Sequence, residues 1–293
     1  MPSAYASRLR LASEVARLRR DHGYPSIEHF ARGIQVSRQR LSAIENGHGS
    51  SENLMAAICD HMKVGAQRRK AMIAAARSSR AKGWWSGREA AMGIRQARAA
   101  EFEDDVAVLC EYQISLIPGL LQLPAYSEAR VQADPSATAE GFDPTQALLA
   151  RQKRQELLTR DGGPIYDVVI DELAIRRLAT TTDVMQRQLA HLLAVATENS
   201  RIAIRALPIA AHIVGQAVPR SAFSIYQYHD PDDPVVVVID TMTQDLIITE
   251  PPAVGQYRSA FERLRAASYT PEHTRRLLFD LTSGDRLQPI GQS

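Results

Sequence analysis

The sequence predicts an α+β protein: an all-α N-terminal domain of five helices, followed by a larger α+β domain with a mostly antiparallel sheet. Residues 8–80 carry apolar side chains at helical spacing, whereas short later segments alternate apolar and polar side chains as strands do. Strands that follow one another, joined by turns such as Pro231-Asp232-Asp233-Pro234, favour α+β over a doubly wound sheet. A chain of 293 residues is long enough for two domains.

The change of pattern sets the expected boundaries. We expect a helical domain at residues 1–82, a junction with Trp84 and Trp85 at 83–100, and the α+β domain at 101–293. Adjacent tryptophans between glycines favour packing at the junction, with a partner surface as the alternative. The expected strands are residues 165–170, 201–207, 222–228, 235–239 and 245–248.

Each helix of the first domain has a local signal. The first is expected from residue 8 to about residue 22, and Pro25-Ser26 opens the second. Residues 33–36 then make a tight turn before a third helix, and helices four and five follow a cap at Ser50-Ser51 and a start at Ala66. Two helices joined by such a turn describe a helix-turn-helix unit, whose second helix enters a DNA groove.

Residues 36–47 are the most informative stretch of the chain. Ser37 is placed to cap a helix, Leu41 and Ile44 share one apolar face, and Asn46-Gly47 supplies a left-handed stop. Arginine and glutamine are common major-groove readers of guanine and adenine, and the alternative is an ordinary charged surface helix. The outer face, expected to read bases, consists of Arg38, Gln39, Ser42 and Ala43.

Charge is divided unequally along the chain. Residues 1–82 hold 15 Lys+Arg and 6 Asp+Glu, a net of +9, so the remaining residues carry a net of −7. A basic segment followed by an acidic one indicates that the basic segment contacts nucleic acid. The weaker alternative is that the basic N-terminus is a transit peptide. Binding of this kind weakens with salt because counterions are released from DNA.

Other classes of protein find little support. Cys59 and Cys110 are isolated thiols without metal spacing, so we expect core residues of a cytoplasmic protein with no metal or cofactor. No apolar run is long enough to span a bilayer. His191, His212 and His229-Asp230 are the acid/base candidates, but no catalytic motif accompanies them, and we expect no enzyme and no catalytic residue.

Two expectations concern the start of the second domain. Phe102, Val106, Leu109 and Cys110 predict a helical stripe, with the acids between Glu101 and Asp105 forming a solvated face. The segment Ile117-Pro118-Gly119-Leu120-Leu121-Gln122 breaks the helix, and we expect Leu120 and Leu121 to be exposed for a partner or for the domain junction.

The N-terminal residues resemble a known family. Phe30-Ala31, Val36-Ser37, Leu41, Ile44-Glu45-Asn46-Gly47 and Leu54 are similar to the xenobiotic-response-element (XRE) type of helix-turn-helix domain, relatives of phage repressors. The resemblance assigns base reading to Arg38, Gln39, Ser42 and Ala43. Ile27 and Gln35 depart from the pattern, since the family usually has Gln and often Gly there. The positions expected to contact the DNA backbone are Ser37, Arg40, Asn46, His48 and Asn53, with Ile27 at a family phosphate position.

The rest of the chain also resembles a family. The motifs are Gly83-Trp84-Trp85, Ile117-Pro118-Gly119-Leu120-Leu121-Gln122, Asp171-Glu172-x-Ala174-x-Arg176-Arg177 and Val184-Met185-x-x-Gln188-Leu189. They are similar to the C-terminal domain of the WhiJ-like, antitoxin-like regulators of Streptomyces and other actinobacteria. The resemblance implies control of development or specialised metabolism, together with a small partner protein that is encoded nearby.

The resulting hypothesis is a transcriptional repressor. A nucleoid-associated homodimer would bind a palindromic operator in double-stranded DNA, because one head reads only a few base pairs. The alternative is a small-molecule sensor with a ligand pocket in the second domain, and an enzyme is the third reading. The expected polar liners of that pocket are Arg176, Arg177, His212 and Tyr226.

Overall fold

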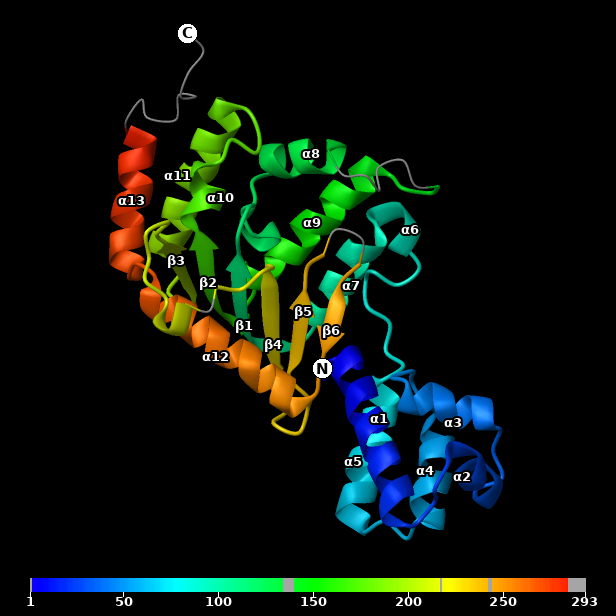
Figure 1. Cartoon of the computed structure of the whole chain (residues 1–293). Helices are drawn as coiled ribbons and strands as arrows, with labels where there is room; N and C mark the ends of the chain where they lie inside the picture. Colours follow the sequence, from blue (N-terminus) through cyan, green and yellow to red (C-terminus); the bar gives the residue numbers. More distant parts are fainter. Residues whose placement is uncertain (1, 134–139, 217, 242–243, 284–293) are drawn as a thin grey trace. The chain divides into compact units, whose positions relative to one another are not determined.

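The computed structural model describes residues 2–133, 140–216, 218–241 and 244–283 (Figure 1). The chain is α+β, as the sequence predicts, and it divides into two compact units. Unit 1 comprises residues 1–86, 101–106 and 228–234. Unit 2 comprises residues 87–100, 107–227 and 235–293.

Unit 1 contains the five helices expected at the N-terminus. Helix α1 begins at Ala4, earlier than predicted, because the Ser3 hydroxyl accepts a hydrogen bond from the Ala6 amide at 3.3 Å. The side chains of Leu11, Phe30, Leu41 and others form one buried core among these helices. The helices are α1 (Ala4–Asp21), α2 (Ile27–Gly33), α3 (Arg38–Glu45), α4 (Glu52–His61) and α5 (Ala66–Ser78).

Serine caps start the three middle helices. Ser26, Ser37 and Ser51 each accept a hydrogen bond from the amide three residues later, at 3.3 Å in every case. The turn between α2 and α3 places Gln35 at φ +55°, a left-handed conformation that favours glycine. Gly47, at φ +81°, ends α3 as predicted.

Two later segments of the chain complete unit 1 around α1. The ring of Tyr5 meets that of Phe102 edge to face, with centroids 4.9 Å apart, and the Tyr228 hydroxyl donates to the Phe102 carbonyl at 3.1 Å. Arg10 lies among the acids of the turn that follows β4. Its guanidinium donates to Asp230 at 2.6 Å and to Asp232 at 2.8 Å.

Unit 2 is built around a single sheet. Its helices and the short 3-10 turns are α6 (Glu89–Met92), α7 (Ile94–Glu103), η1 (Gly119–Leu121), α8 (Pro124–Gln132), α9 (Pro144–Thr159), α10 (Glu172–Arg176), α11 (Thr182–Glu198), η3 (Val214–Gln216), α12 (Pro251–Ala267) and α13 (Pro271–Ser283). The strands are β1 (Val106–Gln113), β2 (Ile165–Asp171), β3 (Ile202–Leu207), β4 (Phe223–Tyr228), β5 (Val236–Ile239) and β6 (Leu246–Ile248).

The sheet is mixed, and the expectation of a mostly antiparallel sheet is wrong. The strand order is β3-β2-β1-β4-β5-β6. Strands β1, β2 and β3 run parallel, whereas the β4–β5 and β5–β6 pairs are antiparallel. The parallel half follows from its connections: α8 and α9 separate β1 from β2, and α10 and α11 separate β2 from β3. Such helical crossovers return the chain in the same direction.

Helices cover the sheet. Helix α12 contacts β3 and β5, and α11 and α13 lie side by side against β3 (Figure 1). The core beneath α12 joins side chains of five strands, β1 to β5, to the helix. Its fully buried members include Tyr112 on β1, Val169 on β2, Val237 on β5 and Phe261 and Leu264 on α12.

The helical stripe expected at residues 102–110 is also wrong. Helix α7 ends at Glu103, Asp105 adopts φ +58°, and β1 begins at Val106. The strand buries Val106 and Leu109 three residues apart, which imitates helical spacing. The acids do not form a solvated face, because Glu103 is 4% exposed and Glu101 accepts a hydrogen bond from Arg8 at 2.5 Å.

The expected exposure of Leu120 and Leu121 is wrong as well, since both are buried. A glutamine holds this segment from a distant helix. The side-chain amide of Gln188, on α11, donates to the Leu121 carbonyl at 2.7 Å, and its oxygen accepts from the Leu123 amide at 2.7 Å. Backbone groups of a buried irregular segment need such partners, so the two motifs form one structural unit.

Asp233 provides a test of unit 1 through pH. Its side chain is 3% exposed, and burial, with repulsion from Asp230, raises the pKa of Asp233 to about 6 despite the nearby Arg10. The folded state therefore binds this proton more tightly than the unfolded state, and the group's contribution to stability is lost as pH rises through 6.

We expect Asp233→Asn to stabilise the protein by about 1–2 kcal/mol at pH 8, and this gain to disappear near pH 4. Urea unfolding at the two pH values measures it. Asp232→Asn is the control, because that side chain is 73% exposed, and it should give no gain at either pH. Equal effects of the two substitutions at pH 8 would contradict the assignment.

Candidate nucleic-acid interface

Helix α3 presents one apolar and one polar face. Leu41 and Ile44 are 0% and 2% exposed and pack toward α1 and α2. Arg38 and Gln39 are exposed at the start of the helix, while Ser42 and Ala43 are half-buried one turn later. Within the described residues, the Arg38 guanidinium has no ion-pair partner, so its donors are free for a ligand.

An ion pair fixes the far end of α3. The Nε and Nη2 atoms of Arg19, on α1, donate to the two carboxylate oxygens of Glu45 at 2.8 and 3.1 Å. Nη1 also donates to the Tyr24 carbonyl at 3.3 Å, just before α2. The hydrogen bond to Glu45 raises the pKa of Arg19. One side chain thus connects α1, the approach to α2 and the last residue of α3.

The positions expected to contact a DNA backbone surround α3. Ser37 and Arg40 are exposed at its first turn, and Asn53 is exposed on α4. At the other end, the Asn46 side-chain amide donates to the Ser42 hydroxyl at 3.2 Å, and His48 Nδ1 donates to the Ala43 carbonyl at 3.1 Å. Both contacts fix polar side chains next to the outer face of the helix.

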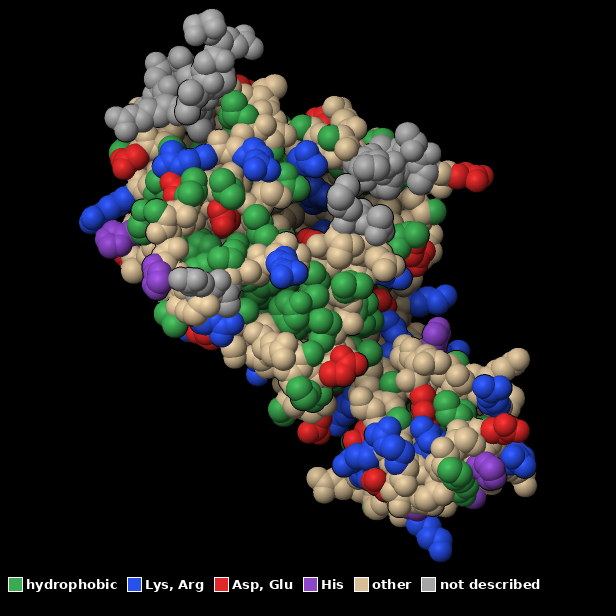
Figure 2. All heavy atoms as spheres, in the orientation of Figure 1, with side chains coloured by type: hydrophobic (Ala, Val, Ile, Leu, Met, Phe, Trp, Pro, Cys, Tyr) green, Lys and Arg blue, Asp and Glu red, His purple; other side chains and the backbone are tan. Residues whose placement is uncertain are grey.

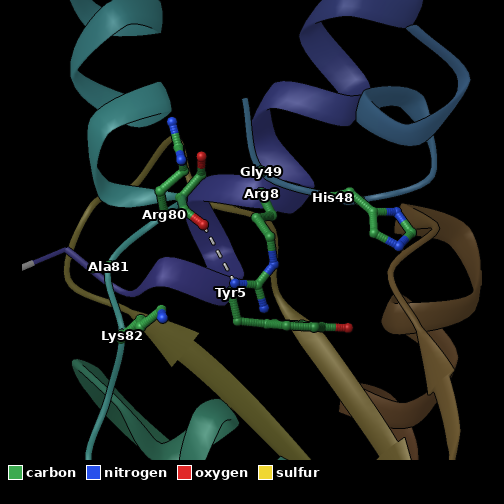
Figure 3. A pocket seen from close by; sticks show the side chains of 9 residues that line it. Tyr5, Arg8, His48, Gly49, Arg80, Ala81 and Lys82 are labelled. Carbon is green, nitrogen blue, oxygen red and sulfur yellow. Dashed lines mark hydrogen bonds between the residues drawn. The ribbon is translucent and has the colours of Figure 1, made fainter. Parts of the chain in front are cut away.

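A hollow of about 610 Å³ lies directly beyond α3 (Figure 3). Tyr5 and Arg8 of α1 lie between His48 on one side and Arg80 and Lys82 on the other (Figure 3). The complete lining is Tyr5, Arg8, Gly47, His48, Gly49, Ser79, Arg80, Ala81 and Lys82. No carboxylate belongs to that lining, so its electrostatic character is positive.

Basic side chains extend over the visible face of unit 1, with few acids between them (Figure 2). Acids of residues 1–82 are paired with arginines of the same unit, among them Glu14 with Arg68 at 2.5 Å and Glu52 with Arg77 at 2.8 Å. These pairs hold α5 to α1 and to α4, and they leave the net positive charge of residues 1–82 on other arginines and lysines. The arrangement suits a polyanion.

The ligand-pocket candidates of the second domain do not line the hollow between α11 and α13. Tyr226 is buried on β4, Arg177 and His212 are exposed, and Arg176 donates to Glu172 at 2.6 Å. That hollow has a volume of about 490 Å³. Its lining is Leu193, Glu272, Arg275, Arg276, Phe279 and Asp280.

The tryptophan pair lies in unit 1. Trp85 is 7% exposed, and its ring meets that of Trp84 edge to face at 5.9 Å. A Cβ atom on Gly83 would lie 2.2 Å from the Trp85 ring, so only glycine fits there. The motif therefore encodes a tight local fold of the chain over Gly83.

Other chemistry finds little support in the described part of the chain. No three His, Cys, Asp or Glu side chains gather there so as to hold a metal ion. Burial raises the pKa of the Cys110 thiol to about 11, which opposes thiolate chemistry, and lowers the pKa of His191. Across the same residues, no helix combines the length and the apolar character needed to cross a membrane.

Sequence reasoning missed the Arg19–Glu45 pair and the hollow. The two residues of the pair are 26 positions apart, so no local spacing connects them. Arg80 and Lys82 stand out only as basic residues after the last helix of the unit. Only its position next to the buried Leu18 could have indicated that Arg19 lies near the core.

The chain belongs to the family described as Domain of unknown function (DUF5753), which it matches over residues 96–280. No curated protein and no solved structure matches the chain. The family match covers most of unit 2 and ends short of α1–α5, so the interface on α3 rests on its own geometry.

The Arg19–Glu45 pair predicts a measurable coupling. Glu45→Gln should destabilise the protein by about 1–3 kcal/mol, because a largely buried guanidinium loses its charged partner. Urea unfolding of Glu45→Gln, Arg19→Met and the double variant gives the coupling, which should exceed ~0.5 kcal/mol.

Asp60→Asn is the matched control, since the Asp60–Arg69 pair is on the surface and its loss should leave the unfolding midpoint unchanged. Additive single variants, with no coupling between positions 19 and 45, would show that the pair does not fix α3.

Proposed function

We propose that residues 1–82 bind double-stranded DNA with sequence specificity, as a helix-turn-helix unit whose α3 enters the major groove. The observation that carries the proposal is the outer face of α3: Arg38 and Gln39 are exposed on a helix whose other face and far end are fixed. A reading helix must be held rigidly, because bidentate hydrogen bonds to base edges tolerate little displacement.

In this proposal each residue has a defined role. Arg38 donates both guanidinium nitrogens to a guanine, and Gln39 pairs with an adenine. Ser42 and Ala43 meet the base edges or thymine methyl groups one turn later. Ser37, Arg40, Asn46, His48 and Asn53 contact phosphates and set the orientation of the helix without reading sequence. Ile27 supplies no hydrogen bond, so α2 contributes less than usual.

The regulatory part of the proposal concerns the DUF5753 segment. We propose that it makes the chain a homodimer on a palindromic operator, with half-sites one helical turn apart, and that a small partner protein controls it. The resemblance to Streptomyces regulators and the acidic balance of residues 83–293 support a repressor of development or specialised metabolism. This assignment makes the protein a cytoplasmic, nucleoid-associated regulator without cofactor or catalysis.

The test begins with selection of bound sequences from a random duplex library by the full chain. Arg38→Ala and Gln39→Ala should then each lose about 1–3 kcal/mol of discrimination between the selected site and a single-base variant at the contacted pair. Titration by gel shift measures both affinities.

Lys70→Ala and Gln67→Ala on α5 are the matched controls, because both side chains are exposed and lie off α3. They should leave discrimination unchanged. If Arg38→Ala and Gln39→Ala bind the selected site as well as the unsubstituted chain does, α3 is not the reading element.

A further inference from the structure

We propose that the hollow beyond α3 is a phosphate-binding site, separate from the base-reading face. Three cations line it, Arg8, Arg80 and Lys82, together with His48. The Glu101 carboxylate pairs with Arg8 at 2.5 Å from outside the lining, so the net positive charge rests on Arg80 and Lys82. This charge repels metal ions and amines and attracts anions. Neither Arg80 nor Lys82 has an ion-pair partner within the described residues, so their charge is available to a ligand.

The walls of the hollow are built rigidly. Ser79 is 3% exposed, and its hydroxyl accepts from the Ser50 amide at 3.2 Å while donating to the Ala76 carbonyl at 2.7 Å. This residue fastens the chain after α3 to the end of α5. A Cβ atom on Gly49 would lie 2.9 Å from the Ser79 carbonyl oxygen, so glycine is required for the close approach.

Arg8 covers a carbonyl group beside the hollow. The carbonyl oxygen of Ser79, the C-cap residue of α5, lies next to Arg8 and Gly49, and alone it would attract cations. Arg8 Nη1 lies 3.5 Å from the Ser79 carbonyl oxygen, and Nη2 donates to Glu101 at 2.5 Å. The Arg8 guanidinium also lies 5.5 Å from the centroid of the Tyr5 ring. Arg8 thus covers the carbonyl, while Arg80 and Lys82, on the side of the hollow away from His48, supply the net charge.

A phosphate group matches this chemistry because it is compact, carries negative charge and accepts several hydrogen bonds from arginine and lysine. Its source is either the DNA backbone beside the base-reading helix or a free phosphorylated molecule. The first source rests on the proposed function, since Gly47 and His48 come two and three residues after the end of α3. The second source does not depend on it.

The experiment compares the unsubstituted full chain with two double variants. Arg80→Gln with Lys82→Gln removes two charges from the hollow. Lys63→Gln with Lys70→Gln removes two exposed charges outside it. Binding of duplex DNA is measured over a range of salt concentrations, and thermal unfolding is measured with and without millimolar pyrophosphate.

If DNA is the source, the hollow variant should reduce the slope of log K against log salt by roughly 2, and the control should not. If a free molecule is the source, pyrophosphate should raise the Tm of the unsubstituted chain and of the control but not of the hollow variant.

If the Arg80→Gln, Lys82→Gln variant matches the control in both measurements, the proposal is overturned, even when the unsubstituted chain binds DNA. A chain that binds no duplex at all refutes the proposed function. Thermal unfolding with pyrophosphate then tests the phosphate site by itself. A Tm shift that depends on Arg80 and Lys82 supports the site, and the absence of a shift overturns it.

Discussion

The bidentate ion pair between Arg19 and Glu45 is the constraint on which the proposed interface depends. Helix α3 has only eight residues, and an isolated helix of that length is not stable in water. Its stability comes from the burial of Leu41 and Ile44 and from the two ends. At one end Ser37 caps the helix, and at the other Glu45 is bound to α1. The outward side chains therefore project from a fixed frame.

In unit 2, glutamine side chains rather than an ion pair hold a short segment in place. The segment that contains Leu120 and Leu121 is irregular yet buried, so its backbone groups need internal partners. Gln188 supplies two of them, and the Gln155 amide donates to the Gln122 carbonyl at 2.7 Å. The residues of these motifs thus maintain the fold of the DUF5753 segment.

Features encoded within a few residues could be predicted from the sequence, and features that depend on distant partners could not. The cap at Ser37 and the stop at Gly47 are local, and both are confirmed. Strand β1 was mistaken for a helix because Val106 and Leu109 are buried three residues apart. The direction of β1 to β3 depends on crossovers, and the exposure of Leu120 depends on Gln188, so neither is visible in the local pattern. The Arg19–Glu45 pair and the hollow likewise arise from packing.

The central claim is that α3 reads a DNA sequence, and a genome-wide map of the positions that the protein occupies on DNA tests it most directly. If α3 reads sequence, the occupied positions should share a recurrent motif made of two inverted half-sites whose centres lie about 10–10.5 base pairs apart. Occupancy that follows base composition alone, with no shared motif, would show that the basic surface binds DNA only through its phosphates and that α3 does not read sequence.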